Sequence, residues 1–384
     1  MSVIVRLVVF LTLALAGAAS PVVTESQQMA RLSLTQRTTA SDIMAKGRAH
    51  YDAPYASRAL VIRDTIAHGA PLVNSGIGYT ATISVGEPPQ TFQVHVDTST
   101  PFTWVGGNTT YRPSETSIET DPQSTVHYPY GIGSINATLY TDKVTLGDLT
   151  VPNQTIGVAT GVDGITGDGV LGIGGSFFPL TGPSFTDNLD AQGTVYNVAL
   201  SFEPSASGPS KGELSFGDVD SSKYFGSITY TSGYYWAFNQ SIAYDSSSIL
   251  TNGAGIVHSL TPYIFLATDA FVQYKDHIGA QLDSTNNLYT ITAAQYQTLK
   301  SLYFNIGGTK FELTPNAQIL PRISPNSSEY YLAVNDMSAL DASNASGLDF
   351  VLGYSFLERF YTVLDTDNGR IGFATTSFTN ATFN

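Results

Sequence analysis

The sequence predicts an all-β protein with two similar lobes around a central cleft. From Tyr79 onward, short runs rich in Val, Ile, Thr, Tyr and Phe are broken by Gly, Pro, Asn and Asp at strand-length intervals. One motif occurs twice, at 96–102 and 257–263, and a Val-Leu-Gly triplet follows each copy, at 170–172 and 351–353. This repeated order predicts two lobes that each place one polar side chain at a shared cleft.

The first twenty residues are typical of a cleaved signal peptide. Arg6 precedes an apolar run that ends in small residues at 16–20. The run is shorter than the roughly 20 residues that a membrane helix needs. We therefore expect a secreted, extracellular protein with no membrane partner.

Residues 21–72 are predicted to be a propeptide. They carry an excess of basic residues, whereas the whole chain has a formal net charge of −14. A basic segment before an acidic body would dock on it, and a disordered tail is the alternative. The acidic body would repel phosphates, so we expect no nucleic-acid partner.

The chain contains no cysteine, so its stability must come from the size of its core. Seven Asn-x-Ser/Thr sites are typical of a glycoprotein. They begin at Asn108, Asn136, Asn153, Asn239, Asn326, Asn344 and Asn380. The six histidines show no metal-ligand spacing, so we expect no metal and no cofactor.

The boundary between the lobes is placed at an aromatic run, 234–236, which gives lobes at 73–232 and 233–384. Helical signals are few. A capped helix start is predicted at Thr268, and a second helix is predicted over 292–302. Asp269 is therefore interpreted as a helix-start residue and not as a catalytic acid.

Several motifs together resemble the pepsin-like aspartic proteases. They are Phe-Gln-Val-His-Val-Asp-Thr at 92–98, Trp104, Tyr-Gly-Ile-Gly-Ser at 130–134 and Asp-Gly-Val-Leu-Gly at 168–172, with further strands at 212–217, 352–357 and 371–374. The resemblance covers about residues 75–384 and includes the lack of cysteine seen in some fungal members. It implies a bilobal pepsin-like fold and a peptide or protein ligand in the cleft. It also implies that Asp97 is the first catalytic aspartate, that Tyr130 and Gly131 lie in the flap over the substrate, and that Trp104 supports that flap.

The second copy of the motif departs from this family. The family uses two carboxylates, one as a base toward water and one as an acid toward the substrate. In the second lobe, His258 replaces the aspartate of the family motif, Leu260 replaces the glycine and Pro262 replaces a hydroxyl residue. In the first lobe only the glycine changes, to Ser99.

The neighbours of the two motif positions are expected to line the substrate site. They are Ser99 and Thr100 in the first lobe and Ser259 and Thr261 in the second. Ser259 and Thr261 keep the hydroxyl groups that would form hydrogen bonds between the lobes.

Three functions remain open from the sequence. The leading interpretation is a secreted aspartic endopeptidase homologue with lost or severely reduced activity, retained for peptide binding. The alternatives are an active acid endopeptidase that uses an Asp97–His258 dyad, and a glycosylated scaffold protein. A monomer is expected, whose partners are a peptide and its own propeptide.

Overall fold

The computed structural model describes residues 67–74, 78–127, 134–175, 182–194, 197–204, 211–320, 328–340 and 347–383. All of these lie in one compact unit, Arg37–Asn384. The predicted signal peptide, most of the predicted propeptide, and the flap residues Tyr130 and Gly131 lie outside the described residues.

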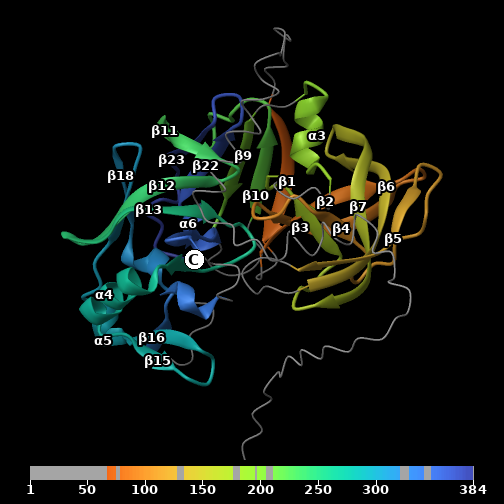
Figure 1. The fold of residues 1–384 in the computed structure, drawn as a ribbon. Coiled ribbons are helices and arrows are strands. Elements are labelled where there is room, and N and C mark those ends of the chain that lie inside the picture. Colours follow the sequence, from red (N-terminus) through yellow and green to blue (C-terminus); the bar gives the residue numbers. More distant parts are fainter. Residues whose placement is uncertain are drawn as a thin grey trace, which may run out of the picture. The chain divides into compact units, whose positions relative to one another are not determined.

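The described residues from His68 to Phe216 are built almost entirely from strands (Figure 1). The elements are β1 (His68–Asn74), β2 (Tyr79–Val85), β3 (Gln90–Asp97), β4 (Thr103–Val105), β5 (Ile118–His127), β6 (Ser134–Leu146), β7 (Leu149–Asp163), β8 (Gly169–Gly172), α3 (Phe185–Ala191), β9 (Asn197–Phe202) and β10 (Lys211–Phe216). The predicted end of the propeptide at residue 72 falls inside β1, and that boundary remains a prediction.

The second half adds more strands and several short helices. They are β11 (Phe225–Tyr234), β12 (Ala237–Tyr244), β13 (Ser247–Val257), β14 (Ile264–Leu266), α4 (Thr268–Ile278), β15 (Gln281–Asp283), β16 (Leu288–Thr292), α5 (Ala293–Tyr296), β17 (Leu302–Ile306), β18 (Thr309–Leu313), η3 (Pro315–Gln318), β19 (Glu329–Tyr331), β20 (Val334–Asp336), η5 (Met337–Ala339), β21 (Phe350–Leu352), α6 (Tyr354–Leu357), β22 (Phe360–Asp365) and β23 (Arg370–Thr375). The fold is mostly β and bilobal, as the sequence predicts.

One antiparallel sheet connects the two lobes. Its strands are hydrogen-bonded in the order β1-β10-β9-β22-β23-β11. Strands from both ends of the chain therefore share this sheet, and in Figure 1 β9, β10 and β22 lie between the lobes. The predicted lobe boundary at 232 falls within β11, which also pairs with β12 of the second lobe.

The repeated motif occupies the same place in each lobe. In the first lobe β3 pairs in parallel with β8, which pairs antiparallel with β4. In the second lobe β13, β21 and β14 repeat this arrangement. Gly172 ends β8 and Gly353 directly follows β21, and a Cβ at these positions would come 2.5 Å from the carbonyl carbon of Pro101 and 2.3 Å from the carbonyl oxygen of Thr261, respectively. Only glycine permits this close approach of the motif loop.

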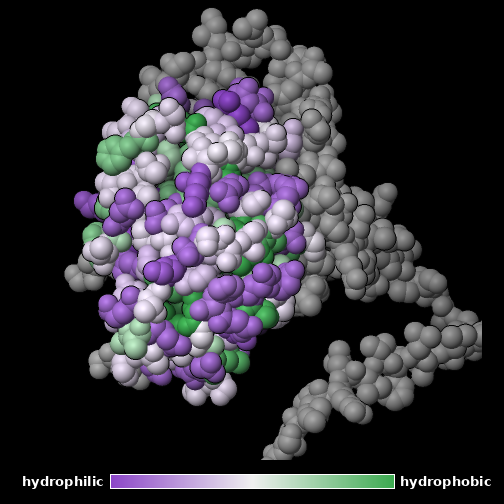
Figure 2. Space-filling view, turned by 90° about the vertical axis from the view of Figure 1, so that its left-hand side faces the viewer, coloured by the Kyte–Doolittle hydropathy of each residue, from purple (hydrophilic) through white to green (hydrophobic). Residues whose placement is uncertain are grey.

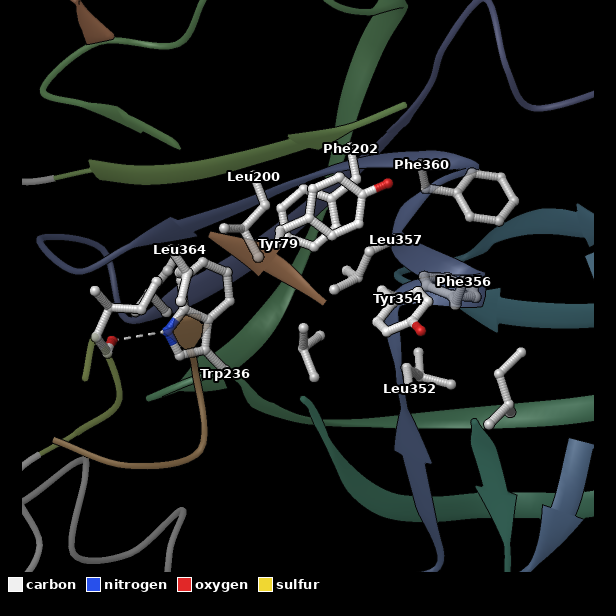
Figure 3. Packing of buried hydrophobic residues seen from close by; sticks show 14 of the residues in the cluster. Tyr79, Leu200, Phe202, Trp236, Leu352, Tyr354, Phe356, Leu357, Phe360 and Leu364 are labelled. Carbon is white, nitrogen blue, oxygen red and sulfur yellow. Dashed lines mark hydrogen bonds between the residues drawn. The ribbon is translucent and has the colours of Figure 1, made fainter. Parts of the chain in front are cut away.

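The core runs through both lobes and their junction (Figure 3). The ring of Tyr79 on β2 stacks on Phe202 of β9, with centroids 3.9 Å apart. Near this stack the indole Nε1 of Trp236 donates to the carbonyl of Ile173 at 3.1 Å, which joins the start of β12 to the end of β8. Burial of this continuous apolar surface is the main stabilising contribution in a chain without disulfides.

The helices agree only partly with the sequence prediction. α4 begins at Thr268, with Asp269 exposed in its first turn, as predicted, but the predicted cap is wrong, because the N-cap residue is Ala267 and it makes no side-chain cap hydrogen bond. Thr292 caps the second predicted helix, but α5 spans only Ala293–Tyr296 and the chain returns to a strand at Leu302. α3 was not predicted, although Ser184 and Asp187 form a capping box at its start.

The surface over the second lobe is mainly polar. Figure 2 shows the side on which Figure 1 labels β18, α4 and α5, and apolar residues appear there as separate spots among polar ones. That pattern is ordinary for a protein surface. No helix among the described residues is long and apolar enough to cross a membrane.

Candidate active site

Asp97 and His258 meet at the junction of the lobes. Asp97 ends β3, and His258 directly follows β13. The carboxylate Oδ1 of Asp97 lies 3.5 Å from Nε2 of His258, and the two side chains are 0% and 1% exposed. The repeated motif therefore brings its two polar side chains together from segments far apart in sequence.

The first-lobe loop holds the carboxylate of Asp97 at one oxygen. Oδ1 accepts hydrogen bonds from the backbone N–H and from the hydroxyl of Ser99, both at 2.7 Å. The other oxygen, Oδ2, is buried and accepts no hydrogen bond from the residues that the structure describes. Ser99 therefore contacts the carboxylate directly, and its place in the substrate site remains a prediction.

Burial lowers the pKa of His258, and the negative charge of Asp97 opposes this shift. The imidazole is accordingly neutral at neutral pH. The separation of 3.5 Å is longer than a good hydrogen bond between nitrogen and oxygen. The contact therefore becomes an ion pair only when acid protonates the ring.

Four hydrogen bonds join the lobes directly beneath this pair. The backbone N–H of Thr98 donates to Oγ of Ser259, and the N–H of Ser259 donates to Oγ1 of Thr98, both at 3.1 Å. The two hydroxyls donate across the junction as well, from Thr98 to Val257 O at 2.8 Å and from Ser259 to Val96 O at 2.7 Å. The arrangement is nearly symmetric, as two copies of one motif would give.

Thr261 differs from its expected role. Its hydroxyl accepts a hydrogen bond from the nearby N–H of Tyr263 at 3.3 Å, and Thr100 makes the equivalent contact with Phe102 at 3.1 Å. Both hydroxyls stabilise their own loops. The partner of Ser259 across the junction is Thr98, which the sequence analysis did not select, although it occupies the equivalent motif position.

Leu260 reaches the first lobe. A Cβ added to Gly78, just before β2, would lie 3.8 Å from Cδ1 of Leu260. The side chain is partly buried. Leu260 thus extends over the junction near the site.

Trp104 is fully buried in a cluster with Ile135, Ala137 and Leu139 of β6. β5 and β6 form the hairpin in which the sequence places the flap. Trp104 therefore packs against the half of β6 that lies nearer the tip of this hairpin. The tip residues Tyr130 and Gly131 lie outside the part of the chain that the structure describes.

Comparisons with known proteins agree with this architecture. The sequence model of the eukaryotic aspartyl protease family matches residues 78–376. The chain belongs to this family. It is 46% identical to polyporopepsin of Irpex lacteus over 346 residues, which cover 83% of this chain and 100% of the relative.

Animal members of the aspartyl protease family are more distant. Pepsin A of Bos taurus is 29% identical over 77% of this chain and 83% of its own length, and gastricsin of Cavia porcellus is 30% identical over 79% and 82%. Among solved structures, the crystal structure of aspartic proteinase from Irpex lacteus superposes with a TM-score of 0.77, covering 83% of this chain and 100% of the other.

The described residues contain no group of three His, Cys, Asp or Glu side chains placed to hold a metal ion. At the junction of the lobes the structure brings together the carboxylate of Asp97, the imidazole of His258 and the hydroxyls of Ser99, Thr98 and Ser259. Family membership makes the coarse class clear: a pepsin-like aspartic endopeptidase relative whose family binds peptides in a cleft.

Proposed function

We propose that this chain is a pepsin-like aspartic endopeptidase homologue whose peptidase activity is lost or severely reduced, and that its cleft is retained for binding extended peptides. In this proposal His258 takes the place of the second catalytic aspartate. The supporting observation is the contact that pairs the carboxylate of Asp97 with the imidazole of His258 and not with a second carboxyl group.

The chemistry of the pair supports reduced activity. In the family, two carboxyl groups share one proton. At acidic pH one is therefore an ionised base while the other is a protonated acid. A neutral imidazole N–H is a very weak acid, and burial opposes formation of the stronger imidazolium acid at His258. The proton donor to the substrate is therefore scarce over most of the pH range.

A second candidate is an acid endopeptidase that uses Asp97 as base and protonated His258 as acid. The 3.5 Å separation favours it, because both groups lie within reach of one bridging substrate or water. This dyad would be competent only below the lowered pKa of His258. A glycosylated scaffold remains the third candidate, favoured if no peptide enters the cleft.

The targeting and processing predictions belong to the same proposal. Residues 1–20 would direct secretion, 21–72 would be a propeptide that binds the acidic body, and Asn108 and Asn136 would be among the glycan acceptors. The mature chain would be an extracellular monomer with lobes at 73–232 and 233–384.

The test is peptide cleavage between pH 2 and 7 by wild type and variants. We expect wild type to be about 10² to 10⁴-fold slower than His258→Asp/Leu260→Gly, the contribution of one acid–base group. This corresponds to about 3 to 5 kcal/mol of barrier. His258→Asp alone should recover less, because the side chain of Leu260 still takes up space beside position 258, where the family has glycine.

The controls separate the three functions. Asp97→Asn should abolish the recovered activity, and His277→Asp, at an exposed position on α4, should recover none. Robust wild-type cleavage that disappears in both Asp97→Asn and His258→Ala would refute the proposal and establish the dyad. A transition-state mimic that raises the melting temperature without turnover supports peptide binding, and no binding supports the scaffold.

A further inference from the structure

The turn between β11 and β12 has an unusual backbone. Tyr234 pairs with Ala237, so Tyr235 and Trp236 alone form a two-residue hairpin turn. Both have positive φ angles, of 49° and 67°. Turns of this kind normally use asparagine and glycine, because a bulky side chain is strained in the left-handed region. Such strain persists only where the surrounding structure imposes it, and it is concentrated at functional sites.

The side chain of Trp236 is bound to the first lobe. Its indole is 0% exposed, and Nε1 donates to the carbonyl of Ile173 at 3.1 Å, the bond that is dashed in Figure 3. The backbone N–H of Ile173 donates in turn to the carbonyl of Asp97 at 2.9 Å. Ile173 therefore connects the indole to the end of the strand that carries the carboxylate.

The backbone of Trp236 is bound to the second motif. Its carbonyl accepts a hydrogen bond from the N–H of Val257 at 2.9 Å, and Val257 directly precedes His258. Three hydrogen bonds thus run in series from the carbonyl of Asp97 through Ile173 and Trp236 to Val257. They share no donor or acceptor atom with the four bonds between the motif loops described above.

The other residue of the turn also contacts the first lobe. A Cβ at Gly175, two residues after Ile173, would overlap the ring of Tyr235, so this ring lies directly on the glycine. Both residues are buried. The left-handed turn therefore brings both of its aromatic side chains against the loop at 173–175, and a side chain at position 175 would displace the turn.

We propose that Trp236 is a positioning residue that fixes the separation between the carboxylate of Asp97 and the imidazole of His258. Its indole binds the first motif through Ile173, and its carbonyl binds the second motif through Val257. The hydrogen bonds and the burial of two aromatic rings offset the strain of the turn. The inference rests on the contact between Asp97 and His258, and it holds whether or not the site cleaves peptides.

The test measures how strongly Asp97 acts on His258. NMR follows the imidazole C2–H signal of His258 through a pH titration of the full chain labelled at histidine, and loss of the signal in His258→Gln assigns it. Asp97→Asn should lower the titration midpoint, because it removes the charge that favours the imidazolium. This effect is measured with and without Trp236→Phe, so contributions from other partners of His258 cancel.

Trp236→Phe keeps an aromatic ring in the core and removes only the indole donor. The effect of Asp97→Asn, expressed as a coupling constant, should shrink at least about twofold in this background, because residues in one hydrogen-bond network couple by that much or more. Gly175→Ala keeps the indole but displaces the turn through Tyr235, so it should weaken the coupling as well. An unchanged coupling in either folded variant overturns the proposal.

Trp104→Phe is the matched control. It also removes a buried indole, and Nε1 of Trp104 has no hydrogen-bond partner among the described residues. The coupling between Asp97 and His258 should be unchanged in this variant, and a loss as large as that in Trp236→Phe would refute a specific role for Trp236.

A further measurement needs no variant. In hydrogen exchange of the wild-type chain, the indole N–H of Trp236 should be protected as strongly as the backbone N–H groups of Ile173 and Val257, because all three belong to one series of bonds. If the indole exchanged freely while these two amides stayed protected, Trp236 could not fix the separation of the motifs, and the proposal would be wrong.

Discussion

At the scale of single residues, Thr98 and Ser259 connect the lobes. Each hydroxyl both donates and accepts across the junction, and both side chains are buried. Removing one of these hydroxyls leaves buried backbone groups of the opposite lobe without partners. Leaving such a buried group unpaired costs more free energy than a hydrogen bond of this kind contributes to stability.

We therefore expect Thr98→Val to lower the free energy of unfolding by about 2 to 4 kcal/mol, since it leaves Ser259 N–H and Val257 O unpaired. Urea unfolding monitored by circular dichroism measures this loss. Thr261→Val is the matched control, because its hydroxyl makes a longer, local contact, and it should cost under about 1 kcal/mol. Thr98→Ser should keep most of the stability. Equal losses at positions 98 and 261 would contradict this account.

Residue-scale sequence reasoning found Asp97 and His258, because a repeated motif preserves position even where chemistry changes. It did not indicate the surroundings of His95, whose Nε2 lies 3.1 Å from the carbonyl oxygen of Thr166 and whose ring lies against Gly78 and Gly167. These residues come from segments distant in sequence, so their convergence appears only in the folded chain.

At the scale of elements, α3 shows how a short helix is fixed by its first turn. Ser184 accepts from Asp187 N, and Asp187 accepts from Ser184 N, each at 3.1 Å. The helix buries Phe185 and Leu189, one turn apart. Both signals are present in the sequence, but they span a single turn inside a strand-rich pattern, which is too short for periodicity alone to indicate a helix.

Ser184→Ala should lower the free energy of unfolding by about 1 kcal/mol, because α3 loses its cap while its apolar side chains stay buried. Thr292→Ala removes an equivalent capping box from α5, which buries no side chain. Fraying of α5 exposes no fully buried side chain and affects only the partly buried Tyr296 at the edge of the core, so this second variant should cost less in the same denaturant experiment. A larger loss at Thr292 would show that burial does not decide the effect.

At the scale of the whole molecule, the buried histidines connect stability to pH. The folded-state pKa values of His95 and His258 both lie below the ordinary value of 6.5. The unfolded chain therefore binds more protons just below pH 6.5, so the stability contributed by these neutral rings is full above that pH and is lost as the pH falls.

We expect the free energy of unfolding to decline below pH 6.5 by up to about 1.4 kcal/mol per pH unit for each histidine. Denaturant midpoints measured from pH 7.5 to 5 test this, with His95→Gln/His258→Asn compared with wild type. The double variant should show a shallower decline. A wild-type curve that is flat through this range would be incompatible with two neutral buried rings.

The bilobal β fold could be predicted because strand alternation, turn residues and the repeated motif can all be recognised in the sequence itself. The connecting sheet was not foreseen, because β22 and β23 pair with β9 and β11 across more than a hundred residues. Pairing of that kind depends on how the lobes pack and not on local propensity.

The hydrogen bond from Trp236 to Ile173 gives the molecule an internal optical reporter. The chain has two tryptophans, and the other, Trp104, is buried wholly within the first lobe. Fluorescence from Trp236 would move to longer wavelength if the lobes separated while each remained folded, whereas emission from Trp104 would stay unchanged until the first lobe itself unfolded. Fluorescence of the remaining tryptophan in Trp104→Phe and in Trp236→Phe would thus show whether the two lobes unfold together or one after the other.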